Sequence, residues 1–240
     1  MNPILRGDLR ARVASPKALT VYTIFLGVLG VLVVLSLPPD FSRADEVRGE
    51  GLLLTVLIVQ AVLVAYFTSA TASGEIALEG DKSVEDLVTS PFSARAIGVG
   101  KIASAFCFAG SLVLFAAPVV AVVAGVRGEP LGQIVRAAAV AALIGGTAGA
   151  LGTVYGAVFE SDFSRSFVLW LTLFLLVVAA AALPEPWNTI SPVRAIVVAV
   201  RGGAPAALTM TVLGYALLTL ASIWALRRRV EVIRQHAGIR

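Results

Sequence analysis

The sequence predicts an all-α membrane protein that crosses the bilayer six times. Of its 240 residues, 58% are hydrophobic and only 14% are charged, against roughly 45–50% apolar and roughly 25% charged residues in soluble domains. The apolar residues form runs of about 20, the helix length that crosses the roughly 30 Å hydrocarbon core. Exposed to water, this much apolar surface would drive aggregation. The six spans are expected at residues 18–37, 51–73, 98–126, 131–158, 166–183 and 206–226.

The first element along the chain, residues 1–17, is too polar to enter the membrane. Leu5, Leu9 and Val13 recur at i, i+4 and i+8, and the cations lie largely off that stripe. This pattern favours a short amphipathic helix in the membrane interface, although a merely basic, flexible N-terminus is the alternative. We expect no signal peptide, because no small-residue cleavage site follows a short apolar region. Residues 18–240 then form the six-helix transmembrane domain.

Residues 184–205 break the pattern of long spans before the sixth one. Their apolar stretch, ISPVRAIVVAV, is too short to cross the membrane as a helix. Trp187 suits an interfacial position, and Gly202, Gly203 and Pro205 end the segment. We interpret it as a re-entrant or interfacial hairpin, with a broken seventh span as the alternative.

The distribution of lysine and arginine predicts the orientation. Cations flanking the spans favour the cytoplasmic side. The arrangement with both termini in the cytoplasm puts most of the 19 cations there, and the triplet Arg227–Arg229 is the strongest single element. It also makes the polar segment 74–97 cytoplasmic. The basic residues therefore indicate membrane orientation and not nucleic-acid binding, and we expect a multi-pass protein of the inner (plasma) membrane.

No catalytic or nucleotide-binding motif is visible. HExxH and GxSxG are absent, the only histidine is His236 in the basic tail, and the only cysteine is Cys107. The stretch GVGKI at 98–102 resembles the end of a phosphate-binding loop, but Arg95 and Ile102 stand where that loop needs glycine and Ser or Thr. We therefore expect no enzyme, no metal site and no cofactor in this chain.

The polar residues in the middle of the spans are neutral. Proton- or ion-coupled transporters carry ionisable residues at membrane depth, so coupling to an ion gradient is disfavoured. The candidate substrate path is lined by apolar residues, a few hydroxyls, Gln60, Tyr66 and Tyr155. Such a lining fits a hydrophobic or amphipathic substrate.

The fourth span carries glycines four residues apart, Gly145 with Gly149 and Gly152 with Gly156. Small residues at this spacing let two helices approach closely in lipid. Packing inside one bundle and a dimer interface are equally consistent with the pattern.

The cytoplasmic segment 74–97 contains a pattern for a short surface helix. Ser83 followed by Glu85 and Asp86 suits a helix start, since acidic side chains are favourable near its positive end. Pro91 would end this helix and Ser93 would cap the next one. A solvated loop is the alternative.

Three stretches of the sequence together resemble permease subunits of type-2 ABC exporters. They are NPILRGDLRAR at the N-terminus, the loop KSVEDLVTSPFSARAIGVGKIAS, and the fourth span with GAVFESDFSRS. In the loop, residues 82–85 stand where the family has Gly-Thr-Leu-Glu and residues 90–93 where it has Thr-Pro-Leu-Ser, while Gly100 and Lys101 match directly. Lys82 in place of the glycine and the extra acidic Asp86 depart from the family pattern.

The resemblance implies a permease that dimerises, with itself or a similar permease, and binds two copies of a separate ATPase, which holds ATP and Mg. The loop would be the coupling helix, and the segment 184–205 part of an extracellular gate. The permease of the haem exporter of cytochrome c maturation has a similar loop and is an alternative. A non-transporting regulatory scaffold and an intramembrane enzyme are the others. The residues expected to couple to the ATPase are Arg6, Arg10, Glu79, Lys82, Ser83, Val84, Glu85, Asp86 and Leu87.

Overall fold

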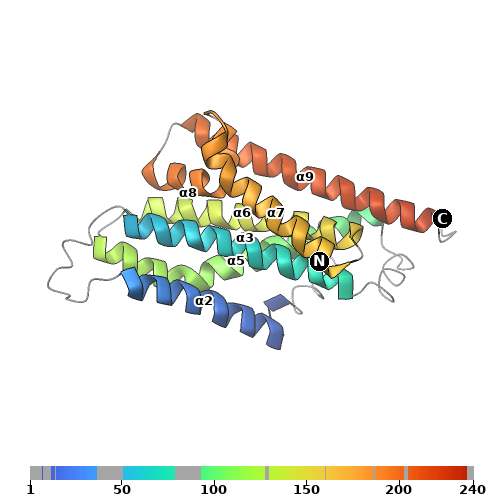
Figure 1. Cartoon of the computed structure of the whole chain (residues 1–240), viewed down its shortest axis with the longest axis horizontal. Helices are drawn as coiled ribbons and strands as arrows, with labels where there is room; N and C mark the ends of the chain where they lie inside the picture. Colours follow the sequence, from blue (N-terminus) through green and yellow to red (C-terminus); the bar gives the residue numbers. More distant parts are fainter. Residues whose placement is uncertain are drawn as a thin grey trace.

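The structure is a computed structural model, and it describes residues 7, 12, 13, 15–36, 51–78, 93–127, 130–159, 161–185, 187–202 and 205–236. Within these residues it is all-helical (Figure 1). The elements in chain order are α2 (Pro16–Ser36), α3 (Gly51–Leu78), α5 (Ala94–Arg127), α6 (Leu131–Val158), α7 (Asp162–Ala182), the 3-10 helix η3 (Trp187–Ile190), α8 (Pro192–Arg201) and α9 (Pro205–His236).

Within the described residues, six helices are long and apolar enough to cross a membrane: α2, α3, α5, α6, α7 and α9. The predicted number of spans is therefore confirmed, and the chain fits a multi-pass membrane protein. The fourth span has the predicted bounds, 131–158. The fifth begins at Asp162 and not at 166, because residues 162–165, which were expected to lie before the span, are already helical. The start of α2 and the end of α9 lie at the same end of the bundle (Figure 1).

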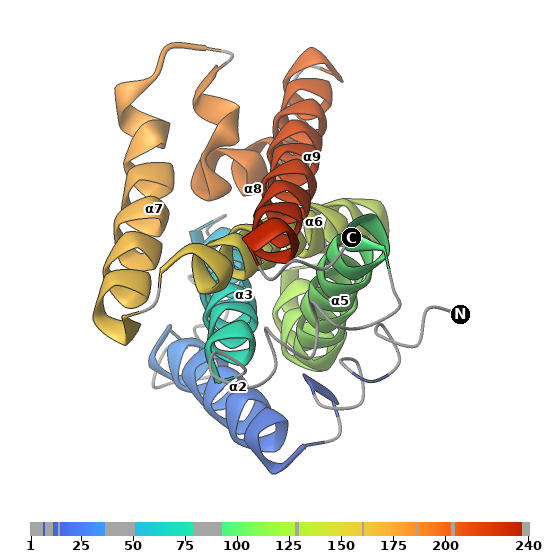
Figure 2. The same cartoon turned by 90° about the vertical axis from the view of Figure 1, so that its right-hand side faces the viewer.

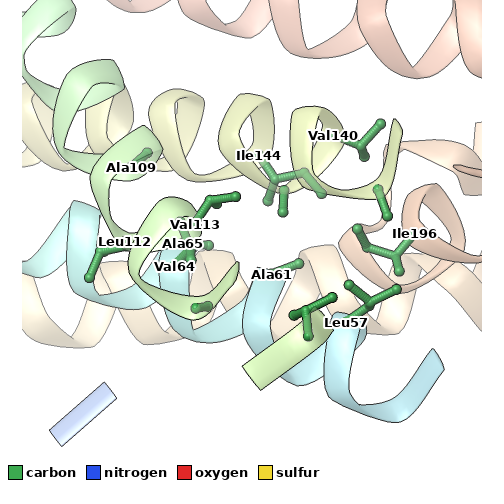
Figure 3. Close-up of a cluster of buried hydrophobic side chains, with 14 of the residues drawn as sticks. Leu57, Ala61, Val64, Ala65, Ala109, Leu112, Val113, Val140, Ile144 and Ile196 are labelled. Carbon is green, nitrogen blue, oxygen red and sulfur yellow. The ribbon is translucent and has the colours of Figure 1, made fainter. Parts of the chain in front are cut away.

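The core of the bundle forms around α6, which packs against α3 and α5. Figure 3 shows the buried side chains that meet there, among them Val64 from α3, Leu112 from α5, Ile144 from α6 and Ile196 from α8. α7 stands at the edge of the bundle, on the far side of α3 and α8 from α5 (Figure 2).

Glycines bring α6 into close contact with its neighbours. A Cβ added at Gly149 would lie 2.7 Å from the Ala105 Cβ of α5, and one at Gly152 would lie 2.8 Å from the Ser69 Cα of α3. One at Gly145 would collide with the side chain of Val64. These glycines thus have their packing partners inside one chain.

The sixth span continues as a helix beyond its predicted end at residue 226. Val230 packs against Ala94 and Ile97 at the start of α5, and the Arg229 Nε donates to the Ala157 carbonyl oxygen of α6 at 3.2 Å. These contacts hold the basic end of α9 to the end of the bundle where α6 finishes and α5 begins.

The segment before α9 folds back as η3 and α8. The hydroxyl of Tyr215 in α9 donates to the Ile190 carbonyl oxygen at 2.7 Å, and the Ser191 Oγ donates to the Val177 carbonyl oxygen of α7 at 3.3 Å. α8 has only 10 residues, about 15 Å of helix, and it ends at Gly202, whose φ of 69° is the left-handed conformation that glycine adopts easily. The described residues of the segment therefore form no helix long enough to span a membrane, and they are bonded to both α7 and α9.

Candidate functional site

The predicted coupling residues Glu79, Lys82, Ser83, Val84, Glu85, Asp86 and Leu87, like Arg6 and Arg10, lie outside the described residues. The helices on either side show where the segment attaches: α3 ends and α5 begins at the end of the bundle where α2 starts (Figure 1). The predicted cap of α5 is confirmed, because the Ala96 backbone N–H donates to the Ser93 Oγ at 3.2 Å. The segment thus connects two core helices at that end.

A cavity of about 150 Å³ opens between α3 and α7 near the same end of the bundle. It is lined by residues from two helices and mixes aromatic, hydroxyl and charged side chains. Its lining residues are Tyr66, Ala70, Ser73 and Gly74 from α3 and Asp162, Arg165, Ser166, Leu169 and Trp170 from α7.

Arg165 provides the positive charge of this pocket. Its side chain is only 8% exposed, whereas that of its ion-pair partner Asp162 is 95% exposed. Asp162 occupies the first turn of α7, where a carboxylate is favourable because of the helix dipole. The guanidinium is thus enclosed between α3 and α7, while its counter-ion stands outside.

Aromatic rings form one wall of the pocket and continue along α7. The rings of Tyr66 and Trp170 meet with centroids 4.8 Å apart, and those of Phe163 and Phe167 stack at 6.2 Å. Phe163, Phe167 and Phe174 are exposed on the outside of α7. The pocket therefore opens beside a broad apolar surface.

The three residues of the predicted substrate path do not share one cavity. Tyr66 lines the pocket, whereas the Tyr155 hydroxyl is 2.9 Å from the Thr172 Oγ1 and joins α6 to α7. Gln60 is buried in α3, and its Oε1 has no hydrogen-bond partner among the described residues. The last of the four glycines predicted to pack in the fourth span, Gly156, is half-buried near the end of α6.

Most of the hydroxyls in the spans bond to their own helix. The Ser69 Oγ donates to the Ala65 carbonyl oxygen at 2.7 Å, the Thr71 Oγ1 to that of Phe67 at 2.7 Å, and the Thr153 Oγ1 to that of Gly149 at 2.8 Å. Such bonds satisfy the hydroxyls without creating a catalytic cluster. The described part of the chain also brings together no group of three His, Cys, Asp or Glu side chains that would hold a metal ion.

Sequence reasoning missed the charged half of the pocket. Arg165 counted only as one of the 19 cations whose distribution predicts the orientation, and Asp162 lay outside the fifth span, which was expected at 166–183. The available signal was the i, i+3 spacing of Asp162 and Arg165 followed by Trp170, an aromatic residue suited to the membrane interface. Only the packing of α7 against α3 places Arg165 beside Tyr66.

No model of a known protein family matches the sequence, and the curated proteins contain no significant match. The comparisons therefore assign the chain to no family. Its function has to be argued from the residue patterns and from the geometry of the bundle.

Proposed function

We propose that the chain is the membrane-spanning permease subunit of an ATP-driven exporter of the type-2 ABC class. In this proposal it works as a dimer with two separate ATPase subunits and moves a hydrophobic or amphipathic substrate. The observation that carries the proposal is the segment 79–93 between α3 and α5, whose sequence resembles the coupling segment of those permeases.

The charge distribution of the bundle supports an energy source outside the membrane. The polar side chains buried in the middle of α3, α5 and α6 are neutral, among them Gln60, Thr68 and Thr147. An ion-coupled transporter needs ionisable groups at that depth, and this sequence carries no nucleotide-binding motif of its own. A partner ATPase accounts for both observations.

The positions of the cations support a cytoplasmic assignment for the end of the bundle where the coupling segment attaches. Described helices place Lys17, Arg95, Lys101, Arg165, Arg227, Arg228 and Arg229 toward that end, and Arg127, Arg136, Arg194 and Arg201 toward the other (Figure 1). The positive-inside rule then places the richer end in the cytoplasm. An ATPase docked there would contact the segment between α3 and α5.

The η3–α8 segment supports a gate at the opposite end. Its hydrogen bonds to Val177 of α7 and to Tyr215 of α9 attach it to both helices. In the proposed cycle, ATP-driven closure of the ATPases shifts α3 and α5, and the bundle passes this movement through α6 to the segment.

The test is ATP-dependent transport in sealed vesicles that contain the chain and its partner ATPase. Replacing Glu85 and Asp86 together by alanine is expected to lower substrate-stimulated ATP hydrolysis about tenfold, because two charge-assisted contacts to the ATPase are lost. The matched control replaces Asp45 and Glu46, which precede α3, and should leave the rate unchanged. If both double variants lose the same share of ATP hydrolysis, or if neither loses any, the coupling assignment is wrong.

The same experiment separates the alternatives. A non-transporting scaffold would bind the ATPase and show no ATP-dependent accumulation of any substrate. A permease of the haem-exporter type would accumulate haem, and this accumulation would stop in the variant with both acidic residues replaced.

A further inference from the structure

We infer that the pocket between α3 and α7 binds the anionic head of an amphipathic molecule, a phosphate or a carboxylate. The tail of that molecule would lie along the apolar outer surface of α7. This is a binding property of the chain alone, so it holds or fails independently of the proposed partnership with an ATPase.

The burial of Arg165 is the first argument. Taking a guanidinium out of water is costly unless anionic groups and hydrogen-bond acceptors replace the water. In this structure the side chain is 8% exposed, and the Arg165 Nη2 pairs with one oxygen of Asp162. A guanidinium has five N–H donors in a planar fork that fits phosphate and carboxylate groups. Among the described residues, one carboxylate at one nitrogen leaves donors for a second anion.

The second argument is the exposure of Asp162. Its side chain is 95% exposed, so the carboxylate can turn toward water at little cost and leave the guanidinium to another anion. In this pair only the cation is enclosed, while the carboxylate stays in contact with solvent. Asp162 therefore acts as a competitor that an incoming anionic head displaces.

The size and lining of the pocket select the ligand. A cavity of about 150 Å³ exceeds the roughly 10–15 Å³ that a cavity needs to hold one water, yet it is too small for a headgroup together with its chains. Tyr66 and Ser166 line the pocket together with Arg165, and their hydroxyls are further donors that an anion could use. The Ser73 hydroxyl already donates to the Ala70 carbonyl oxygen at 3.0 Å.

The surroundings of the pocket fit the tail. Phe163 is 78% exposed and Phe167 57% exposed on α7, so an acyl chain leaving the pocket can lie against their aromatic rings. Tyr66 and Trp170 are the amphipathic rings that favour the level of the lipid headgroups. The anion would thus sit at the headgroup level with its chain in the hydrocarbon.

The experiment uses Trp170 as a reporter in the full chain, purified into nanodiscs. Replacing the exposed Trp187 and Trp224 by phenylalanine leaves Trp170 as the only tryptophan. Phosphatidic acid with brominated chains should quench its fluorescence at a lower mole fraction than brominated phosphatidylcholine. Equal quenching by the two lipids overturns the proposal.

Three variants test the assignment to Arg165, because they are expected to raise, lower and leave unchanged the mole fraction of phosphatidic acid that gives half quenching. Arg165→Gln should raise the half-quenching mole fraction of phosphatidic acid about tenfold, since a charge-assisted contact is lost. Asp162→Asn should lower it a few-fold, because the competing carboxylate is gone. Arg194→Gln, which breaks the exposed ion pair with Glu185 toward the other end of the bundle, should leave it unchanged.

Two readouts keep the test decisive. The folding of Arg165→Gln is checked by its elution in size-exclusion chromatography and by its helical content. If this variant does not fold, Asp162→Asn alone tests the proposal. Quenching by phosphatidic acid that is unchanged or weaker in Asp162→Asn overturns it. Inorganic phosphate added as a competitor separates the sources of the anion. Restored fluorescence means that the phosphate group is sufficient for recognition, and persistent quenching means that the lipid is bound through both head and tail.

Discussion

The two consecutive helices α6 and α7 are both apolar, yet they occupy opposite positions in the bundle. Over an apolar 18-residue stretch of each helix, α7 has the higher mean hydropathy, 2.1 against 1.7, but only 17% of that stretch is buried inside the chain, against 56% for α6. In water the more apolar helix would be expected inside. In lipid the tails are as apolar as the side chains, so the helix with small residues is the one that packs closely.

The difference separates two tasks. Gly149 and Gly152 let α6 touch α3 and α5 and fix the bundle. α7 keeps large side chains such as Phe163 and Phe174 on its outer surface and meets α3 mainly around the pocket. The buried helix therefore determines stability, and the outer helix carries the site where a ligand or a partner can act.

The largest expected effect would test the buried side of this comparison. Gly152→Ala places a Cβ within 3 Å of the Ser69 backbone, and backbone cannot move aside as a side chain can. We expect a loss of stability of about 3 kcal/mol, the upper part of the range for overpacking. The measurement is thermal unfolding of the chain in detergent.

Two controls define this result. Gly132→Ala in the same helix meets nothing within 4 Å and should be neutral or raise stability by up to ~1 kcal/mol. Phe174→Ala on the outer surface of α7 should change stability by less than about 0.5 kcal/mol. If Phe174→Ala lowers stability as much as Gly152→Ala does, the proposal that α6 determines stability more than α7 is wrong.

A smaller effect is expected where α9 holds the segment that follows α7. Tyr215→Phe removes the hydroxyl that donates to the Ile190 carbonyl oxygen at 2.7 Å. The loss should be about 1–1.7 kcal/mol, the upper range for single hydrogen bonds between membrane helices. Faster amide exchange confined to residues 187–191 would support the anchor. The control Thr209→Val removes an exposed bond within α9 and should not change that exchange.

The smallest effect concerns the direct bond between the two helices, from the Tyr155 hydroxyl to the Thr172 Oγ1 at 2.9 Å. A double-mutant cycle with Tyr155→Phe and Thr172→Val should give a coupling energy of about 0.6 kcal/mol, the average for such pairs in membrane proteins. A value near zero would mean that α7 is held mainly by its aromatic contact at Tyr66 and by η3 and α8.

Much of the fold could be predicted because the length of each apolar run has to match the bilayer. The fourth span, 131–158, has its predicted bounds, and Ser93 caps α5 as expected. Helix ends were less predictable where polar residues continue a helix outside the apolar run. Thus α7 begins earlier than predicted, at Asp162, and α9 continues to His236 because Val230 finds a partner surface on α5.

The candidate site was predictable only in part. The sequence predicted Tyr66 as part of the substrate path. The position of Arg165 beside a span predicted only the orientation of the chain in the membrane and not which residues Arg165 contacts. The sequence by itself determined the six spans, their low charge and the position of the segment 79–93, because these follow from hydropathy and local pattern. Only the tertiary structure decided that the α6 glycines pack against α3 and α5, and that α7 encloses a guanidinium beside Tyr66. Packing between apolar helices depends on surface shape, which hydropathy does not encode.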